Sequence, residues 1–471
     1  MTEPLRLAVV GHTNTGKTSL LRTLTRDPHF GDVADRPSTT RHVEGAALQV
    51  DGEPLVALFD TPGLESAGHL LDYLEHLQLH DGRRDGPDQI DRLLATPAAA
   101  GEYEQEAKVL RQLRQSDAAL YVIDAREAVL GKYRDELEIL NLCGKPLLPV
   151  LNFVAQPPHR ASDWRQALAR LGLHVVVEFD SVAPALDGEQ QLYDRLGTLL
   201  EGQAALLARL ADDRGQQRQL RHQTALALVA NLLVDVAALR RGAPRERIDA
   251  IAAELRDQVR RHEAAAIAEL LSLYSFDPDT VERTNLPPSA PRLDLDLFHP
   301  EVVKEMGMQL GVGVASGAAA GAAVDLFTGG LSLGIGTVVG ATVGGLWQSA
   351  ESFGQRLLGR VRGWQEITVD DTILGVLALR LHRLLLALEQ RGHASQQRVR
   401  LETGDAFEAT LRKGRLPEAL REARGQPRWS RLDPSFEDSR RRQVLVARLV
   451  AELEAATDAP PPSEATRPPP V

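Results

Sequence analysis

The sequence contains almost no cysteine: Cys143 is the only one among 471 residues. A single cysteine excludes an intramolecular disulfide framework and any metal site built from several thiolates. Its neighbours Leu140, Leu142 and Gly144 are typical of a buried thiol rather than a reactive one. The scarcity of cysteine is compatible with a reducing cytoplasm.

The chain also lacks an excess of basic residues, since 54 Lys and Arg face 65 Asp and Glu and give a formal net charge of -11. Broad nucleic-acid-binding surfaces need Lys and Arg to neutralise phosphates, so such a surface is not expected. Arg440, Arg441 and Arg442 form one local cluster, which is either a basic patch or the solvated face of a helix.

No leader sequence is recognisable at the start of the chain. Residues 5–10 form an apolar run, with neither a basic n-region nor a long h-region before a cleavage site. We therefore expect a cytoplasmic protein.

Length and composition are those of a multidomain globular protein. At 471 residues the chain is longer than single domains, whose cores stop growing at roughly 250 to 300 residues. Hydrophobic residues make up 43% and charged residues 25%, close to globular averages.

Short apolar runs alternate with helical segments over residues 1–200. This alternation predicts an α/β domain of the P-loop NTPase class, in which a mostly parallel sheet carries helices on both faces. The expected strands are 5–10, 46–50, 55–60, 118–124, 146–152 and 174–179.

Helical sequence is expected in two further places. Residues 65–116 should form a helical insertion in the first domain, where His69, His76 and His80 could share one helix face; acidic and leucine neighbours favour an amphipathic helix over a metal site. Residues 201–457 should form a mostly α-helical domain, with helices at 201–240, 245–271, 370–391 and 440–456, followed by a Pro-rich disordered tail at 458–471.

The strongest motif follows the first expected strand. Residues 11–18 match G-x-x-x-x-G-K-[ST], and a helical run continues from there. In such a loop the glycines let backbone N–H groups face a triphosphate, the lysine supplies a point charge and the last hydroxyl reaches magnesium. The pattern predicts a nucleotide site made of Gly11, Thr13, Asn14, Thr15, Gly16, Lys17, Thr18 and Ser19.

Two more segments complete the expected site. Asp60 and Gly63, in an Asp-Thr-Pro-Gly turn after the strand 55–60, put a carboxylate near the magnesium shell and an N–H near the γ-phosphate. Residues 37–41, with the sequence Pro-Ser-Thr-Thr-Arg, lie between the two motifs, and a threonine hydroxyl there could complete the coordination. Loss of the γ-phosphate would release this loop, so the pattern predicts a switch.

These three motifs resemble those of the Era and TrmE type of bacterial GTPases, which carry a P-x-T-T-R loop and a D-T-P-G or D-T-A-G turn. The resemblance covers about residues 1–200. It implies GTP as the nucleotide and Thr18, Thr40 and Asp60 as the magnesium ligands. It also implies a catalytic set of Lys17, Asn14, Thr40 and Gly63.

Two positions carry further meaning under this resemblance. Asn14 resembles the asparagine that holds a potassium ion beside the phosphates in the potassium-activated members of the group. Leu64 stands where Ras-like proteins have a water-positioning glutamine. Slow hydrolysis is therefore implied, dependent on potassium, a partner or self-association through the G domain.

The chain departs from the family at the base-recognition motif. Where N-K-x-D is expected, residues 152–155 read Asn-Phe-Val-Ala, so Asn152 is kept but the lysine and aspartate are not. The missing carboxylate predicts weak or altered base selectivity. Asp180, followed by Ser181, lies where the next base-contacting loop is expected; it is either a replacement acid or a cap at the end of a strand.

Glycine recurs at four-residue spacing in two stretches, 313–321 and 336–344, of the segment 309–347, whose only charged residue is Asp325. Such stripes let two helices approach closely, which predicts a glycine-rich helical hairpin. The hairpin is either a peripheral or re-entrant element at the inner membrane or a tightly packed soluble one. Its first half is shorter than the roughly 20 apolar residues that a span needs, which favours the soluble form.

An Era-like GTPase followed by such a helical region also resembles bacterial proteins in which a GTPase is fused to a domain of unknown function. We therefore expect a GTP-binding protein with magnesium, and with potassium if Asn14 acts as proposed, whose slow hydrolysis switches the helical domain. The alternatives are an RNA-directed factor in tRNA modification or ribosome assembly, and a nucleotide-gated membrane-associated module with little turnover. The overall acidity speaks against the RNA-directed factor.

Overall fold

The computed structural model of the protein describes residues 3–27, 29–30, 43–81, 85–276, 297–298, 331–332, 364–391 and 416–457. The chain divides into two compact units. The first comprises Met1–Gln219 and Glu389–Arg398, and the second comprises Leu220–Leu388 and Val399–Val471.

A six-stranded sheet forms the centre of the first unit, in the order β2-β3-β1-β4-β5-β6. All neighbouring strands pair in parallel except β2, which is antiparallel to β3 at the edge. The strands are β1 (Leu5–Val10), β2 (Glu44–Val50), β3 (Glu53–Asp60), β4 (Ala118–Asp124), β5 (Leu147–Asn152) and β6 (Val177–Glu178). The last strand is shorter than the expected 174–179 because only Val177 and Glu178 pair with β5.

Both faces of this sheet are covered, because side chains of alternate strand residues point to opposite sides. Ala8 and Val10 belong to one core with residues of α2, α3, α4, α5 and α6, whereas Leu7 and Val9 belong to another with residues of α1, α7 and the start of α8. These helices are α1 (Lys17–Thr25), α2 (Ala67–Asp81), α3 (Gly86–Leu94), α4 (Glu104–Arg114), α5 (Gly131–Leu142), α6 (Ala161–Arg170) and α7 (Gly188–Leu199).

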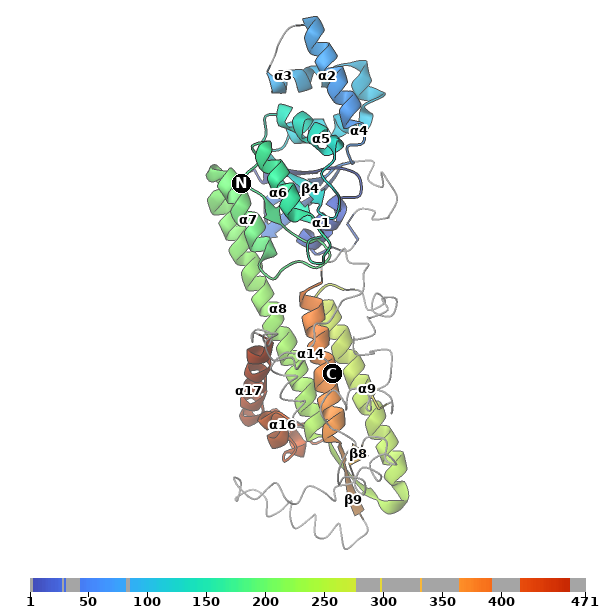
Figure 1. Ribbon diagram of the computed structural model, residues 1–471. Helices are drawn as coiled ribbons and strands as arrows, with labels where there is room; N and C mark the ends of the chain where they lie inside the picture. The colour runs from blue at the N-terminus through green and yellow to red at the C-terminus, as the bar shows by residue number, and fades with distance from the viewer. Residues whose placement is uncertain are drawn as a thin grey trace, which may run out of the picture. The chain divides into compact units, whose positions relative to one another are not determined.

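The segment between β3 and β4 folds into three helices and a short 3-10 turn. Helices α2, α3 and α4 gather beside α5, with η1 (Pro97–Ala100) between α3 and α4 (Figure 1). Asp85 caps α3 by accepting a hydrogen bond from Asp88 N at 3.0 Å. The whole segment thus lies on one edge of the domain, immediately after the turn that contains Gly63.

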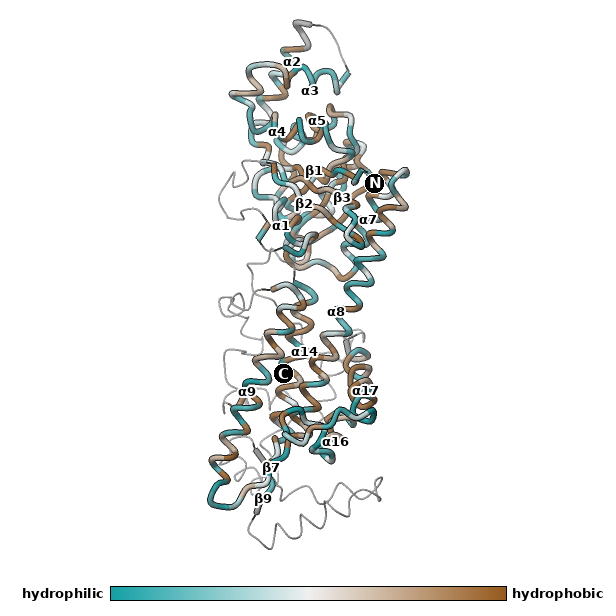
Figure 2. The backbone as a smooth tube through the Cα atoms, turned by 180° about the vertical axis from the view of Figure 1, so that it is seen from behind, coloured by the Kyte–Doolittle hydropathy of each residue, from teal (hydrophilic) through white to brown (hydrophobic). Residues whose placement is uncertain are grey.

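Long helices dominate the second unit, where the end of α8, α9 and α14 run side by side (Figure 1). Helix α14 is apolar over most of its length and appears largely in the hydrophobic colour in Figure 2. The elements are η2 (Glu201–Gln203), α8 (Ala204–Ala238), η3 (Arg245–Arg247), α9 (Ile248–Leu273), α14 (Asp371–Glu389), α16 (Glu418–Ala423), η4 (Pro427–Trp429) and α17 (Arg440–Thr457).

A small antiparallel sheet in this unit was not expected from the sequence. It contains β7 (Arg240–Pro244), β9 (Trp364–Val369) and β8 (Leu331–Ser332), in the order β7-β9-β8. Strand β7 directly follows α8, so the helix expected over 201–240 ends at Ala238. The strand forms because β9 supplies a hydrogen-bonding partner and buries Ile367 and Val369.

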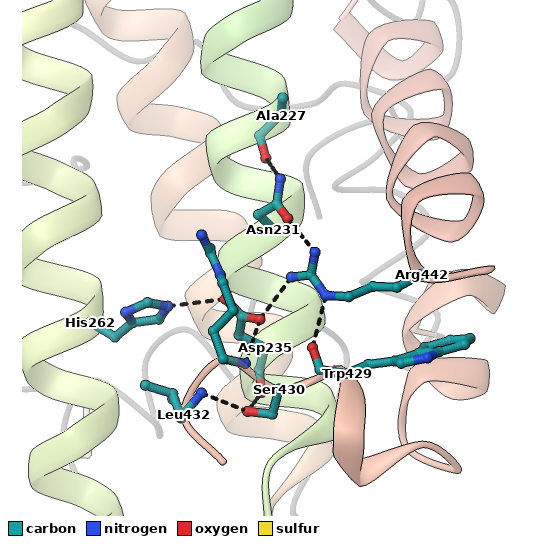
Figure 3. A network of polar contacts seen from close by, with 9 residues as sticks. Ala227, Asn231, Asp235, His262, Trp429, Ser430, Leu432 and Arg442 are labelled. Atoms are coloured by element: carbon teal, nitrogen blue, oxygen red, sulfur yellow. Dashed lines mark hydrogen bonds and ion pairs between the residues drawn. The ribbon is translucent and has the colours of Figure 1, made fainter. Parts of the chain in front are cut away.

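Asp235 of α8 is the centre of a buried polar network in the second unit (Figure 3). Its carboxylate accepts hydrogen bonds from Arg442 Nη2 at 2.8 Å and Arg431 Nε at 2.6 Å, and contacts His262 Nε2 at 3.1 Å. The same Arg442 donates to Asn231 Oδ1 and to the carbonyl oxygen of Trp429, both at 2.8 Å. Arg442 is therefore not part of a basic surface patch with its two neighbours, because it neutralises a buried aspartate.

The fold class is confirmed: a mostly parallel sheet flanked by helices is followed by a largely helical region. Within the described ranges, no helix combines the length and apolar character that a membrane crossing would need. The glycine-rich hairpin expected at 309–347 falls outside the described residues apart from 331–332, and the tail expected at 458–471 falls wholly outside them.

Candidate nucleotide site

The loop between β1 and α1 has the backbone shape that its glycines predict. Gly16 has a φ of 90° and precedes the first residue of α1. A Cβ at this position would lie 2.3 Å from Asn152 Nδ2, so any other residue would collide with β5. Asn14 also has a left-handed φ, of 62°, and its side chain is exposed.

Lys17 is buried inside this loop. Its Nζ donates to the carbonyl oxygens of Gly11 at 3.2 Å and His12 at 2.7 Å. Burial lowers the pKa of the ammonium, although Asp60, Glu136 and Glu65 act in the opposite direction. Within the described part of the chain no carboxylate forms an ion pair with Lys17, so the hydrogen bonds to its ammonium come from neutral carbonyls and the site favours an anionic ligand.

Thr18 and Asp60 meet directly beneath the loop. Thr18 Oγ1 donates to Asp60 Oδ2 at 2.5 Å, and the carboxylate is almost fully buried. Burial raises the pKa of Asp60, and among the described residues its other oxygen, Oδ1, accepts no hydrogen bond. A hydroxyl beside a buried carboxylate with an unused oxygen fits the oxygen ligands that Mg²⁺ prefers.

The turn after β3 lies along the P-loop. Leu64 N donates to the carbonyl oxygen of Gly11 at 3.3 Å, which extends the pairing of β1 with β3. Gly63 approaches Thr13 so closely that an added Cβ would lie 2.7 Å from its backbone nitrogen. Thr13 Oγ1 in turn donates to Glu65 Oε1 at 2.9 Å. The two sequence motifs therefore form one continuous edge.

Asn152 connects three segments of the site. Its Nδ2 donates to the carbonyl oxygen of Thr15 at 3.0 Å, and its Oδ1 accepts from Ser181 N at 2.8 Å and Phe153 N at 2.9 Å. The side chain is fully buried. Asn152 thus fixes the P-loop to the end of β5 and to the loop after β6, as a neutral group with its hydrogen bonds satisfied.

Asp180 is committed to backbone contacts. Its carboxylate accepts hydrogen bonds from the backbone nitrogens of Ala155 at 2.8 Å and of Val182 and Ala183 at 2.9 Å. These contacts are those of a cap at a strand end, the second of the two roles considered for this residue. A direct contact to a base would require Asp180 to share or give up one of them.

Phe153 occupies the position of the family's lysine. A Cβ built on Gly16 would lie 3.0 Å from its ring, so Phe153 borders the P-loop. On the ring, the guanidinium of Arg126 lies 4.1 Å from the centroid, while its Nη2 pairs with Asp124 Oδ2 at 2.7 Å. On this side of the P-loop, the Phe153 ring with the Arg126 guanidinium on it therefore stands in place of the family's lysine side chain.

A second polar network, which the sequence did not predict, lies behind the P-loop. His12 Nδ1 lies 2.5 Å from Glu136 Oε1, and Lys132 Nζ lies 2.9 Å from His12 Nε2. Because an ammonium can only donate, Nε2 accepts and Nδ1–H donates to the carboxylate. Tyr121 donates to the other oxygen of Glu136 at 2.8 Å. His12 lies at a variable position of the P-loop motif, whereas no short motif marks Tyr121, Lys132 or Glu136, which join it only through folding.

Some expected site residues lie outside the described part of the chain. Thr40 and the rest of the loop 37–41 lie outside the described residues, so the third expected magnesium ligand is not part of the geometry given above. In the segments that are described, no cluster of three or more His, Cys, Asp or Glu side chains is suited to a metal ion. On α2, His76 Nδ1 instead contacts the carbonyl oxygen of Asp72 at 2.7 Å.

Comparisons with known proteins give two family matches. A family described as 50S ribosome-binding GTPase matches residues 6–153, and a domain of unknown function, DUF3482, matches residues 165–451. GTPase Der of Xylella fastidiosa is 30% identical over 148 residues, 31% of this chain and 25% of Der. The tRNA modification GTPase MnmE of a Synechocystis species is 31% identical over 135 residues, 28% of each protein.

The chain thus spans about a quarter of the length of these curated relatives. Among solved structures, Era of Aquifex aeolicus bound to GDP and AlF4- is 17% identical, with a TM-score of 0.30 over 42% of this chain and 57% of that one. The match to the domain of unknown function covers more than half of the chain. This protein therefore belongs to the family defined by that domain, which is joined here to an N-terminal P-loop domain of the bacterial GTPase class.

Proposed function

We propose that this protein binds GTP with Mg²⁺, hydrolyses it slowly and changes the state of its helical C-terminal part according to the nucleotide bound. One observation carries the proposal: the buried ammonium of Lys17, held by two neutral carbonyls, next to the Thr18 and Asp60 pair. A triphosphate would satisfy the first group, and a magnesium ion would satisfy the unused oxygen of the second.

Each residue then has a distinct part. Lys17 and the backbone N–H groups of residues 13–18 bind the phosphates, and the dipole of α1 reinforces them. Thr18 and Asp60 hold magnesium, which neutralises phosphate charge when bound. Gly63 lies against Thr13, where the backbone N–H of Gly63 can donate a hydrogen bond to the γ-phosphate. Thr40 is proposed as a further magnesium ligand by the resemblance to the GTPase family.

Potassium is a separate part of the proposal. Asn14 is exposed on the P-loop, as a side chain must be to hold a monovalent ion beside the phosphates. The charge of such an ion would substitute for an arginine finger, because Leu64 is apolar and cannot orient water. Hydrolysis should then be faster in potassium than in sodium.

Base selectivity follows from the site around Asp180. Both carboxylate oxygens of Asp180 already accept hydrogen bonds from backbone nitrogens, so neither is free to bind guanine alone. The position of the family's aspartate is occupied by Ala155. We therefore expect the protein to bind GTP, with poorer discrimination against ATP than a site with a dedicated carboxylate would give.

Phosphate release from GTP and from ATP, each in potassium and in sodium, tests the function directly. We expect slow hydrolysis that is stimulated by potassium and depends on magnesium. Lys17→Ala should reduce nucleotide affinity at least tenfold, since it removes the only buried cation described in the loop. Arg209→Ala, at an exposed pair with Glu53, is the matched control and should leave both affinity and turnover unchanged, because Glu53 begins β3 at the opposite end from Asp60.

Equal use of ATP and GTP would remove guanine selectivity from the proposal and leave a general nucleotide hydrolase. Binding without any turnover would instead identify a nucleotide-gated module. If Lys17→Ala bound nucleotide as tightly as the unmodified protein, the P-loop assignment itself would be wrong.

A further inference from the structure

A carboxylate lies at the rim of the P-loop, in a position that the family motifs do not specify. Glu65 Oε1 accepts a hydrogen bond from Thr13 Oγ1 at 2.9 Å, and Glu65 is an exposed residue. Thr13 belongs to the same P-loop whose carbonyl oxygens hold the Lys17 ammonium, so the carboxylate lies beside the loop that buries Lys17.

The backbone of Glu65 is held from two sides. Glu106 of α4, itself almost fully buried, accepts hydrogen bonds through Oε1 from Ser66 N at 3.0 Å and Glu65 N at 3.4 Å. On the other side, Leu64 N is bonded to the carbonyl oxygen of Gly11 at 3.3 Å. The direction of the Glu65 side chain is thus determined by the P-loop and by the helical insertion together.

Leu64 faces the opposite way. Its side chain is fully buried in the core shared with α2 and α5, so it has no access to solvent at the opening of the site. Residue 65 is consequently the first position after Gly63 that presents a polar side chain to the P-loop.

From this geometry we propose that Glu65 orients the attacking water in nucleotide hydrolysis and that Glu106 positions Glu65 for this role. The inference rests on the proposed hydrolytic function. Glu65 is the catalytic residue, because it would contact the water, whereas Glu106 is a positioning residue that acts through the backbone of residues 65 and 66.

The chemical step is a hydrolysis without any change of oxidation state. The Glu65 carboxylate leaves Thr13 Oγ1 and accepts a hydrogen bond from water, which directs the water oxygen towards the γ-phosphorus. A bond forms between that oxygen and phosphorus, and the bond from phosphorus to the bridging oxygen of the β-phosphate breaks. The nucleoside diphosphate leaves, and the proton of the water is carried away on inorganic phosphate.

The test compares kcat with nucleotide affinity in the full-length protein. Glu65→Ala should lower kcat about a hundredfold while the Kd for GTP changes less than about threefold, because the residue acts on the water and not on the nucleotide. Glu65→Gln retains an oxygen that can accept a hydrogen bond and should stay within about tenfold of the unmodified rate. Glu75→Ala removes an exposed carboxylate from α2 and serves as the control.

Glu106 is tested by a double-mutant cycle. Glu106→Ala should lower kcat at unchanged affinity, and the double variant Glu65→Ala, Glu106→Ala should be no slower than Glu65→Ala alone, because both changes remove the same orientation of water. Glu106→Gln keeps an acceptor for the two backbone donors and should restore most of the rate. A merely structural Glu106 would give additive losses in the double variant.

Two results would overturn the inference. An unchanged kcat in Glu65→Ala would exclude the role of Glu65 in hydrolysis. Tighter GTP binding and faster turnover in Glu65→Ala would mean that the hydrogen bond between Glu65 and Thr13 inhibits the enzyme. Neither result touches the proposed function, which fails separately if the unmodified protein neither binds nor hydrolyses GTP.

Discussion

Burial governs the chemistry of Cys143, which lies at the end of α5 in the core between the sheet and the helical insertion. Loss of hydration raises the pKa of its thiol from 9.0 to about 12, although Arg114 acts in the opposite direction. Only the thiolate is nucleophilic, so a thiol held neutral and inaccessible is unreactive. The sequence predicted a buried thiol here, and the structure confirms it.

We expect Cys143 to be silent towards Ellman's reagent at about pH 8 in the native protein and to react at one thiol per chain once guanidinium unfolds it. Because the folded pKa is raised, the thiol stabilises the fold fully below pH 9.0, and this contribution disappears as pH rises towards about 12. Between pH 9.0 and about 12 the free energy of unfolding should therefore fall less in Cys143→Ala than in the unmodified protein. Rapid labelling of the native protein would contradict the assignment.

At single positions, the sequence revealed those site residues whose spacing is fixed by a motif. Lys17, Thr18 and Asp60 follow from two short patterns, because a P-loop and a strand-end aspartate meet wherever β1 pairs with β3. Glu136 belongs to no pattern and lies 124 positions from His12, whose position in the P-loop motif is variable. Their pairing depends on how α5 packs against the sheet, which short-range sequence rules do not encode.

Helix α17 offers a comparison of two arginines that differ mainly in burial. Arg442 has 5% of its side chain exposed and contacts Asp235, whereas Arg448 has 46% exposed and pairs with Glu422 at 2.6 Å. Breaking a buried pair leaves a desolvated charge behind, but an exposed pair is replaced by water. The two residues should therefore contribute very differently to stability.

We predict that Arg442→Ala lowers the free energy of unfolding by about 3 kcal/mol, whereas Arg448→Ala lowers it by less than about 1 kcal/mol. Urea unfolding of both variants under the same conditions measures the difference. Comparable losses would mean that Arg431 and His262 alone compensate Asp235.

The network around Asp235 also makes the stability of the protein depend on pH in the acid range. Burial tends to raise the pKa of Asp235, but hydrogen bonds from His262 and Arg431 outweigh burial and leave it below 3.8. A lowered folded pKa stabilises the protein above the unfolded value, and the contribution is lost as pH falls through the folded pKa. The difference in the free energy of unfolding between Arg442→Ala and the unmodified protein should consequently become smaller in strongly acidic solution, which urea unfolding at several pH values measures.

Elements with a clear period were predictable, and those formed by long-range pairing were not. The expected helices at 245–271 and 440–456 correspond closely to α9 and α17, because apolar residues recur along them at helical spacing. Residues 240–244 show no alternation, and their strand exists only because β9, more than a hundred positions later, pairs with them. Likewise, the contact of α4 with the turn after β3 depends on Glu106, which no helix rule identifies.

At the scale of the whole chain, family boundaries and structural boundaries differ. The match to the domain of unknown function begins at residue 165, inside the first unit and before α7, whereas the second compact unit begins at Leu220 within α8. The last part of the nucleotide-binding unit, including Asp180 and Ser181, therefore belongs to the family domain.

The division into two compact units predicts two unfolding transitions in calorimetry, of which nucleotide should shift that of the first unit more. A ligand that binds the native state at 100 times its Kd stabilises it by about 2.7 kcal/mol, which corresponds to a rise in Tm of about 5 to 10 °C for a domain of this size. Because Lys17, Thr18 and Asp60 all lie in the first unit, its transition should respond more strongly to GTP and Mg²⁺ than the transition of the second unit. Lys17→Ala should abolish the shift and leave both transitions in place. A single transition would mean that the two units unfold as one cooperative body. Two transitions whose Tm values rose equally with nucleotide would mean that nucleotide binding stabilises the helical part as strongly as the P-loop domain itself.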